Sequence, residues 1–430
     1  MEAVSSQQNR LRAEQTLATT CCIAGGGPAG MMLGLLLARA GVDVVVLEKH
    51  ADFLRDFRGD TIHPSTLEVL HELDLLDEFL KLPHQKAYGL AVYIGNTAVP
   101  FADFSHLPTQ CKFIAFIPQW DFLNFLGQQA AHYPGFHLRM RADAIDVIEE
   151  SGRVAGLRAQ TPNGLLEIRA NLVVAADGRS SILREKAGLE VRDLGAPMDV
   201  LWFRLSRRPD DPEQSMGRFA AAQIFIMISR GEYWQCGYVI PKGSIEQIRA
   251  GGIEAFRANI TTIAPFIGDR VAELRDWNNL SLLTVRVDRL QQWYREGLLC
   301  IGDAAHAMSP VGGVGINLAI QDAVAAANLL AEALRTKQLT IDHLRDVQRR
   351  RELPTRITQR FQVAIQNRII SRVLKRGGIL KPPLFIRMLA RFPVLRRIPA
   401  RLVGMGIRPE HVTAAAESNR SHQVTASPRY

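Results

Sequence analysis

The sequence predicts an α/β protein with a parallel sheet, an inserted antiparallel sheet and a helical C-terminal segment. Three observations predict this fold class. A βαβ pattern of about 30 residues stands near the start of the chain. Alternating, aromatic-rich runs occupy the middle, and helical patterns interrupted by prolines follow about Arg351. Hydrophobic residues make up 47% of the 430 residues and charged residues 22%, which excludes a disordered chain, a coiled coil and a fibrous repeat.

The βαβ pattern follows a polar N-terminal arm that ends near Thr20. Cys21–Ala24 predicts a short buried strand, and glycines then lead into a helix from about Gly27 to Ala40. Gly41 ends this helix, and Val42–Leu47 predicts a second buried strand. Because a helix connects these two strands, we expect them to be parallel and covered on both faces.

The strand pattern changes twice along the chain. Tyr88–Val99 and Val200–Val239 show alternating runs that are typical of antiparallel strands. Leu172–Ala176 and Leu298–Ile301 return to the short apolar type of a parallel sheet. We therefore expect a discontinuous first domain over 20–87, 119–190 and 296–350, a second domain over 88–118 and 191–295, and a helical basic region over 351–430.

A glycine motif lies between the first strand and the first helix. Gly25 to Gly30 satisfies G-x-G-x-x-G, in which Gly25 permits a tight turn and Gly27 lets the backbone approach a pyrophosphate. Glu48 ends the second strand, where its carboxylate can accept a hydrogen bond from a ribose hydroxyl. The residues predicted to form this dinucleotide site are Gly25, Gly27, Pro28, Ala29, Gly30, Glu48 and Lys49.

A second motif favours FAD over NAD. Asp303 follows an apolar strand, where it can accept hydrogen bonds from a polyol such as a ribityl chain. The glycines that follow let backbone amides approach a flat ring, and the next helix, which runs to about Leu334, directs its positive end at that ring. The predicted ring contacts are Pro310, Gly313, Gly315, Ile316 and Asn317.

A third motif stands between these two. Asp177-Gly178 follows the apolar strand Leu172–Ala176, so its carboxylate and turn can support the cofactor from the opposite side. Together the three motifs resemble, in order and separation, the single-component (group A) FAD-dependent monooxygenases, the family of para-hydroxybenzoate hydroxylase and the ubiquinone-pathway hydroxylases. The resemblance covers roughly Cys21 to Leu334.

The resemblance implies a Rossmann-type FAD-binding domain, an inserted substrate domain and no separate NAD(P)H domain. The glycine motif and Glu48 would hold the ADP part of FAD, and Asp303 its ribityl chain. Pro310–Asn317 would line the isoalloxazine ring. The Asp177-Gly178 turn matches a family motif that is implicated in binding both FAD and NAD(P)H.

Two further residues match the family less specifically. Arg58 stands where the family usually has an arginine near the flavin and the pyrophosphate, and a surface salt bridge is the alternative. Gln119 precedes a predicted helix and resembles a flavin-contacting Gln or Arg.

No catalytic residue is assigned from the sequence. His306 follows a strand end among alanines, where a packed, hydrogen-bonded imidazole is more common than a proton carrier. His63 could reach the ring or the substrate, and Arg179 could meet the phosphates of a nicotinamide cofactor or only solvent. The flavin carries out the difficult step, so the protein supplies position, electrostatics and exclusion of water.

The resemblance implies an FAD-dependent monooxygenase, or hydroxylase. NADH or NADPH would reduce FAD, and O2 would give a flavin C4a-hydroperoxide that hydroxylates an aromatic, phenolic or quinone-like small molecule. Because water promotes loss of hydrogen peroxide, the substrate pocket must be apolar. The inserted sheet offers aromatic side chains that could form its walls or its own core: Trp202, Phe203, Phe225, Tyr233 and Trp234.

Two other functions stay open. An FAD-dependent reductase of an isoprenoid or another hydrophobic substrate would need no O2. A non-catalytic flavin-binding protein would show no substrate-stimulated oxidation of NAD(P)H.

The chain carries a net charge of +9, and its cationic groups are concentrated near the C-terminus. Arg368 to Arg408 contains eleven Lys or Arg residues and no Asp or Glu, with apolar residues between them. This pattern favours either peripheral contact with an anionic membrane or a surface helix with a solvated basic face. No motif supports nucleic-acid binding.

The cysteine pattern and the apolar segments bear on location. The five cysteines show neither metal-ligand spacing nor a disulfide framework, so we expect no metal site and a reducing compartment. The first eighteen residues lack the apolar core of a secretory signal, and no run reaches the about 20 apolar residues of a membrane span. We therefore expect a cytoplasmic protein, with or without peripheral membrane contact.

Overall fold

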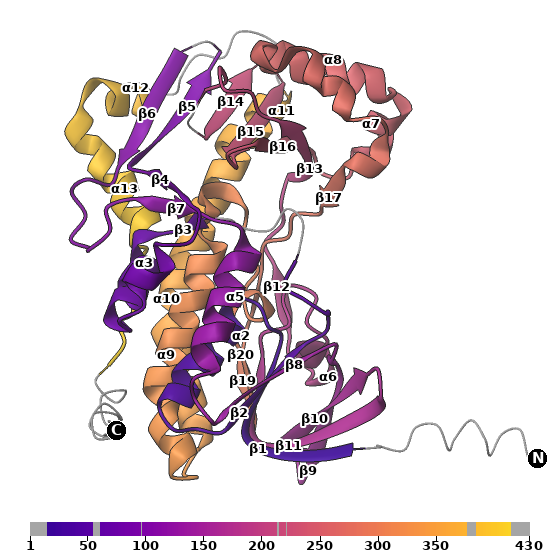
Figure 1. Ribbon diagram of the computed structural model, residues 1–430, viewed down its shortest axis with the longest axis vertical. Coiled ribbons are helices and arrows are strands. Elements are labelled where there is room, and N and C mark those ends of the chain that lie inside the picture. The colour runs from indigo at the N-terminus through magenta and orange to yellow at the C-terminus, as the bar shows by residue number, and fades with distance from the viewer. Residues whose placement is uncertain are drawn as a thin grey trace, which may run out of the picture.

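Two β-sheets lie at opposite ends of the molecule, and long helices run between them (Figure 1). The computed structural model describes residues 15–54, 61–95, 97–212, 215–220, 222–375 and 384–413. Within these ranges the first sheet has the strand order β19-β20-β11-β1-β2-β8, with the β9–β10 hairpin joined to β11. Its strands are β1 (Gln15–Ala24), β2 (Val44–Glu48), β8 (Phe136–Met140), β9 (Asp143–Glu150), β10 (Arg153–Thr161), β11 (Gly164–Ala175), β19 (Tyr294–Arg295) and β20 (Leu298–Cys300).

The centre of this sheet is parallel, as the sequence predicts. β1 pairs in parallel with both β11 and β2, and β11 pairs in parallel with β20. Successive strand residues point to opposite faces, so Cys21 and Ile23 pack against the helices α2 (Pro28–Arg39), α5 (Gln119–Ala130) and α9 (Gly315–Arg335). Cys22 and Ala24 pack against the β9–β10 hairpin and α6 (Ile182–Lys186) on the other face. The central strands are therefore covered on both sides.

The first two strands differ in length from the sequence expectation. β1 begins at Gln15 rather than Cys21, because residues 15–19 pair with 166–170 of β11 outside the buried part of the sheet. These residues are exposed or half-buried, so their polar pattern does not reveal the strand. β2 covers Val44–Glu48 rather than Val42–Leu47.

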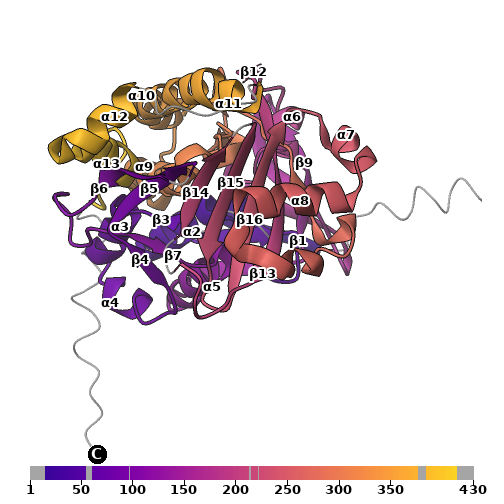
Figure 2. The ribbon, with the colours of Figure 1, turned by 90° about the horizontal axis from the view of Figure 1, so that it is seen from above.

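The second sheet has the order β17-β13-β16-β15-β14-β5-β6 in the described part of the chain. Its pairs are antiparallel except for β14 and β5, which are parallel. Helices α7 (Ile245–Ala250) and α8 (Ile253–Ile263) lie over its outer face (Figure 2). The strands are β5 (Gly89–Ile94), β6 (Thr97–Asp103), β13 (Met198–Ser206), β14 (Met216–Ala220), β15 (Gln223–Ser229), β16 (Tyr233–Pro241) and β17 (Ser281–Leu283).

Two smaller strand groups lie between the large sheets. β3 (Thr61–Ile62) and β4 (Gln85–Ala87) pair with β7 (Ile114–Phe116), next to α3 (Pro64–Glu72) and α4 (Leu76–Phe79). β12 (Val191–Asp193) pairs with β18 (Asp288–Leu290). These strands belong to the segments through which the chain passes from one large sheet to the other.

The C-terminal part is helical, as the sequence predicts. α10 (Ile341–Ile365) continues through a π-helical turn, η6 (Gln366–Ile370), into α11 (Ser371–Lys375), which reaches the second sheet (Figure 1). α12 (Leu384–Arg391) and α13 (Arg397–Gly404) then return past β6.

One segment of the described chain, Val311–Arg335, is long and apolar enough to cross a membrane by length and composition. Of its most apolar window, 78% is buried inside the fold. This segment contains α9, which forms part of the core between α2 and α10. Its hydrophobicity is therefore explained by burial within the protein.

Candidate active site

The glycine turn between β1 and α2 is closely packed on two sides. A Cβ atom on Gly25 would lie 2.3 Å from the carbonyl oxygen of Ala176, and Gly25 has a φ of +107°. A Cβ on Gly30 would lie 2.0 Å from the carbonyl oxygen of Gly25. The turn, the start of α2 and the end of β11 can pack this closely only with glycine at both positions.

The third glycine of the turn faces open space. Gly27 is the N-cap of α2, and a Cβ built on it would meet nothing within 4 Å. No side chain of the described residues caps this helix end. Backbone N–H groups of the first turn are therefore available for an anion, with the positive end of the helix dipole behind them.

Glu48 lies beside this turn at the end of β2. Its Oε2 accepts a hydrogen bond from the Gly26 N–H at 3.2 Å, and its Oε1 accepts one from the His50 N–H at 3.0 Å. The residue is only 8% exposed. Each carboxylate oxygen has further lone pairs, so this position also fits an acceptor for a ribose hydroxyl. Lys49, the next residue, is exposed.

The Asp177-Gly178 turn follows β11 at the same edge of the sheet. Asp177 Oδ2 accepts hydrogen bonds from the N–H groups of Ile182 and Leu183, at 2.9 and 3.3 Å, and so fixes the start of α6. Asp177 Oδ1 is buried and has no partner among the described residues. Burial raises the pKa of this carboxyl group. Its unpartnered oxygen is therefore a buried polar atom that a ligand could satisfy.

Asp303 follows β20, and the residue before it lies close to the start of α2. A Cβ on the preceding Gly302 would be 3.1 Å from the Cβ of Ala29. Asp303 Oδ2 lies 3.2 Å from a guanidinium nitrogen of Arg179, and each side chain is about one-third exposed. The structure thus brings Arg179 to Asp303, a pairing that the sequence does not indicate.

Sequence reasoning missed Arg184, which connects these two motifs. This buried guanidinium donates to the Ala304 carbonyl at 3.1 Å and to the Arg179 carbonyl at 2.6 Å. It holds the turn after β11 against the turn after β20. Its partner Ala304 lies 120 positions away, so no local signal in the sequence identifies this contact.

The Pro310–Asn317 segment packs against β3. The Thr61 hydroxyl donates to the Gly313 carbonyl at 3.0 Å, and a Cβ on Gly313 would lie 2.7 Å from that hydroxyl oxygen. Pro310 is exposed and Gly315 is half-buried, whereas Ile316 is only 8% exposed. The segment therefore has one accessible side and one side packed on the chain.

The Asn317 side chain is used within the protein. Its Oδ1 accepts hydrogen bonds from the His63 N–H at 2.9 Å and the Thr66 hydroxyl at 2.7 Å. Its Nδ2 donates to the Thr61 carbonyl at 3.2 Å. Asn317 therefore fixes the start of α9 against β3 and α3, which positions the preceding glycines.

His63 is buried beside this segment. Its Nδ1 lies 2.7 Å from the Val403 carbonyl oxygen, so Nδ1 carries the hydrogen and Nε2 has a free lone pair. Nε2 is buried without a partner among the described residues, 3.7 Å from the place that a Cβ on Gly313 would take. Burial lowers the pKa of His63 to about 4, which keeps the ring neutral.

His306 is packed and hydrogen-bonded, in agreement with the interpretation that the sequence favours. Its Nε2 lies 2.5 Å from Asp322 Oδ2, and both side chains are almost fully buried. Asp322 also accepts hydrogen bonds from the Gly302 N–H and from Arg351 Nε, each at 3.0 Å. Burial alone would raise the pKa of Asp322, but His306 and Arg351 hold it below its ordinary value.

The two less specific residues lie apart from these motifs in the sequence. Gln119 is the first residue of α5 and is half-buried. Arg58 lies outside the described residues.

These features fit FAD as a bound cofactor. The uncapped end of α2 and the open space at Gly27 suit a pyrophosphate. The carboxylates of Glu48 and Asp303 can accept hydrogen bonds from the hydroxyl groups of such a cofactor. The unpartnered buried atoms Oδ1 of Asp177 and Nε2 of His63 are further polar atoms for which the described chain provides no partner.

Solved structures of other proteins share this fold. One is the OxyS anhydrotetracycline hydroxylase from Streptomyces rimosus, with a TM-score of 0.70 and 23% identity over 90% of this chain and 76% of that chain. Another is the p-nitrophenol 4-monooxygenase PnpA from Pseudomonas putida, with a TM-score of 0.73 and 18% identity over 91% of this chain and 100% of that chain. At these identities the likeness concerns the fold.

Sequence comparison defines the family. The FAD binding domain family model matches residues 18–360. The 6-methylpretetramide 4-monooxygenase of Streptomyces rimosus is 30% identical over 386 residues, which are 89% of this chain and 92% of that protein. The chain therefore belongs to the FAD binding domain family, and it is an FAD-dependent oxidoreductase of the monooxygenase class. The sequence predictions of fold class and enzyme class are confirmed.

Proposed function

We propose that this enzyme uses NADH or NADPH and O2 to hydroxylate an aromatic, phenolic or quinone-like small molecule. The observation that carries the proposal is the convergence of the turns after β1, β11 and β20 around the uncapped N-terminus of α2. Two relatives named as the 6-methylpretetramide 4-monooxygenase of Streptomyces rimosus and the aromatic compound monooxygenase YhjG of Bacillus subtilis support the substrate class. When bound, FAD supplies electron transfer and the activation of O2.

The cofactor contacts are part of this proposal. We assign the backbone at Gly25, Gly27, Pro28, Ala29 and Gly30 to the pyrophosphate, Glu48 with Lys49 to the adenosine ribose, and Asp303 to the ribityl chain. The accessible side of Pro310, Gly313, Gly315, Ile316 and Asn317 would face the ring. We assign Asp177 to the opposite side of the cofactor and Gln119 to the flavin, and Arg58, which lies outside the described residues, stays a sequence prediction. His63 Nε2 can only accept, so we assign it to a hydrogen-bond donor on the ring or the substrate.

The substrate would lie between the Val311 segment and the inner face of the second sheet. Trp202 and Phe219 on this face pack against the same apolar cluster as Val311. Gly237 makes room for this arrangement, because a Cβ there would come within 3.1 Å of the Trp202 ring. The other face is not accessible, since Phe203, Phe225 and Trp234 are fully buried under α8. Of the two alternatives that the sequence leaves open, these three side chains therefore belong to the core of the sheet and not to pocket walls.

This arrangement gives different segments of the chain different roles. We propose that residues 20–87, 119–190 and 296–350 bind FAD, that 88–118 and 191–295 bind substrate, and that the region from 351 supports both. An apolar sheet face opposite the cofactor would exclude water from the reacting atoms. We also propose that the enzyme acts in the cytoplasm, which its five buried, unpaired cysteines support.

The C-terminal helices support a peripheral membrane contact. Leu384, Val394 and Ile398 are 71%, 65% and 69% exposed, and Phe385, Met388 and Phe392 are about half exposed. They alternate with the basic residues of the same segment, a combination that favours an anionic lipid surface. Sedimentation with anionic vesicles tests this. We expect binding that falls at high salt and is lost on truncation before Arg368, whereas equal binding of both proteins would contradict it.

One experiment tests the reaction. The FAD-loaded enzyme is mixed with NADH or NADPH and a set of phenols, quinones and polycyclic aromatic compounds, under 18O2 and under nitrogen. We expect substrate-dependent oxidation of the nicotinamide and a product that gains one labelled oxygen atom. Turnover of substrate that persists without O2 would instead identify a reductase.

A further inference from the structure

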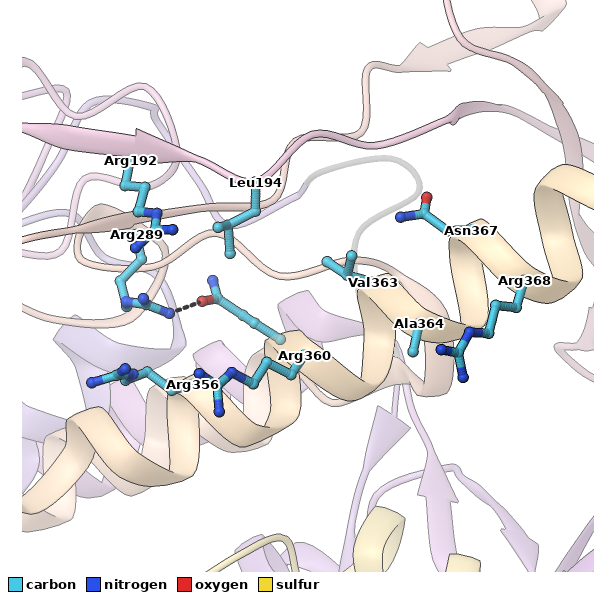
Figure 3. A pocket seen from close by; sticks show the side chains of 10 residues that line it. Arg192, Leu194, Arg289, Arg356, Arg360, Val363, Ala364, Asn367 and Arg368 are labelled. Carbon is cyan, nitrogen blue, oxygen red and sulfur yellow. Dashed lines mark hydrogen bonds between the residues drawn. The ribbon is translucent and has the colours of Figure 1, made fainter.

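A cationic pocket lies apart from the residues assigned above. It has a volume of about 440 Å³ and is lined by β12, β18, α10 and η6. Half of its ten lining residues are arginines, and none is acidic. Figure 3 shows Arg192 and Arg289 extending from the strands on one side and Arg356 and Arg360 from the helix on the other. The volume lies within the range of small-molecule sites, about 300–1,000 Å³.

Secondary structure places these arginines where they repel one another. Arg192 and Arg289 are directly opposite in the β12–β18 pair, a position in which like charges destabilise a sheet. Arg356 and Arg360 are four residues apart on α10, where like charges destabilise a helix. Two independent unfavourable pairs thus converge on one cavity.

Few acidic side chains of the described residues pair with these arginines. Arg356 lies 3.5 Å from Glu352, and within the described part of the chain Arg289 donates to the neutral amide oxygen of Gln359, at 2.8 Å. Among the described residues, Arg192, Arg360 and Arg368 have no acidic partner. Burial and the nearby arginine side chains lower the pKa of Arg289, and Glu352 offsets this only in part. Because Glu352 is not among the lining residues, the pocket is arranged for a further anion.

We propose that this pocket binds the phosphate groups of a small phosphorylated ligand. Guanidinium groups form paired hydrogen bonds with phosphate oxygens, and arginines from two sides can contact separate phosphates. A single carboxylate would satisfy only one of these groups.

The pocket is connected to the segment that we assign to the flavin ring. Gln359, which lines the pocket, donates from Nε2 to the carbonyls of Asp288 and Ala307, at 2.7 and 3.2 Å. One turn further along α10, Gln362 donates to the Ser309 and Val311 carbonyls, at 3.0 and 2.9 Å. Gln359 thus lies between the pocket and the Ala307 carbonyl, and α10 connects it to Gln362, which binds the segment that we assign to the flavin ring.

Two kinds of ligand could supply these phosphate groups. One is the nicotinamide electron donor, an assignment that rests on the proposed function. The other is a phosphorylated molecule that binds independently of the reaction. Both share the phosphate contacts, so the binding test does not require turnover.

The first experiment measures binding of inorganic pyrophosphate to the FAD-loaded, full-length protein by calorimetry. We compare the wild type with the double variant Arg289→Gln/Arg360→Gln and with the control Arg349→Gln, which changes an exposed arginine on α10 that lies outside the pocket. We expect affinity to fall roughly tenfold or more in the double variant, to be unchanged in the control, and to decrease with salt. FAD content and melting temperature show whether each variant is folded. No binding to the wild type, or equal binding to all three proteins, would overturn the proposal.

The second experiment distinguishes the sources. NADPH and NADH are each titrated into the protein with and without saturating pyrophosphate. Competition, together with a raised KM for that nucleotide and an unchanged kcat in the double variant, identifies the donor as the ligand. Binding of both nucleotides without competition supports a separate phosphorylated ligand. Because pyrophosphate binding is measured without turnover, its outcome is independent of whether hydroxylation occurs.

Discussion

Gly30 and Gly25 are in such close contact that a Cβ on Gly30 would lie 2.0 Å from the carbonyl oxygen of Gly25. This contact closes α2 onto the turn that precedes it. Gly27, between them, has a backbone φ of −75° and open space around its Cβ position. Gly30 therefore permits close packing of the backbone, whereas Gly27 leaves space that a ligand can occupy.

The first prediction separates these two roles. Gly30→Ala should destabilise the protein by about 1–3 kcal/mol, because the new methyl group overlaps backbone. Gly27→Ala should leave the apoprotein's urea unfolding within about 0.5 kcal/mol of wild type, since its conformation and space both admit alanine. It should nevertheless weaken FAD binding, because the methyl group takes the space assigned to the pyrophosphate. Flavin fluorescence measures this affinity, and an unchanged affinity in Gly27→Ala would contradict the assignment.

A second prediction concerns the buried charge cluster of His306, Asp322 and Arg351. Asp322→Asn should destabilise the fold by about 3 kcal/mol or more, because it leaves charged and polar partners in the core without their carboxylate. Asp342→Asn is the control, since this exposed carboxylate pairs with the exposed Arg345, and such an exposed ion pair is worth about 1 kcal/mol or less. Urea unfolding measures both. Similar unfolding free energies in the two variants would show that the cluster is not stabilising.

The third prediction uses the pH dependence of His63. Burial lowers its pKa from 6.5 to about 4, so between these values the unfolded chain binds more protons than the folded one. The contribution of His63 to stability is complete above pH 6.5 and decreases by roughly 3 kcal/mol as the pH falls to 4. His63→Asn should remove this part of the pH dependence. Unfolding at several pH values tests it, and parallel curves for the two proteins would contradict the neutral buried ring.

The fourth prediction distinguishes the two faces of the second sheet. Phe203→Ala should destabilise the protein by about 3–5 kcal/mol, because this ring is fully buried under α8. Trp202→Ala removes the neighbouring ring from the face toward Val311, and it should raise the KM for the substrate with normal FAD content. Steady-state kinetics and thermal melting measure the two effects. A raised KM in Phe203→Ala alone would place the substrate on the other face.

Local sequence was sufficient for the elements that bear the cofactor motifs. Gly25, Gly27, Gly30 and Glu48 could be read from spacing, because a βαβ unit with a glycine turn fixes their relative positions. Asp303 was predicted from its place after an apolar strand, and the structure places the preceding Gly302 beside Ala29.

The remaining features depend on contacts between distant residues. Asn317 bonds to His63 and Thr66, more than 250 positions away, so no local pattern identifies its partners. Trp202 and Phe203 are adjacent in sequence and belong to different apolar clusters, and only the packing of distant elements decides that Phe203 is fully buried whereas Trp202 is half-buried. The arginine pocket likewise arises only when β12 and β18 pair.

The most direct test of the account is the flavin content of the protein. The purified apoprotein is titrated with FAD while absorbance and flavin fluorescence are recorded, for the wild type and for Gly27→Ala. The account predicts one equivalent of tightly bound FAD with a perturbed flavin spectrum in the wild type, and weaker binding in the variant. A wild-type protein that stays colourless in the presence of FAD would contradict the central claim that these separate turns form one flavin site.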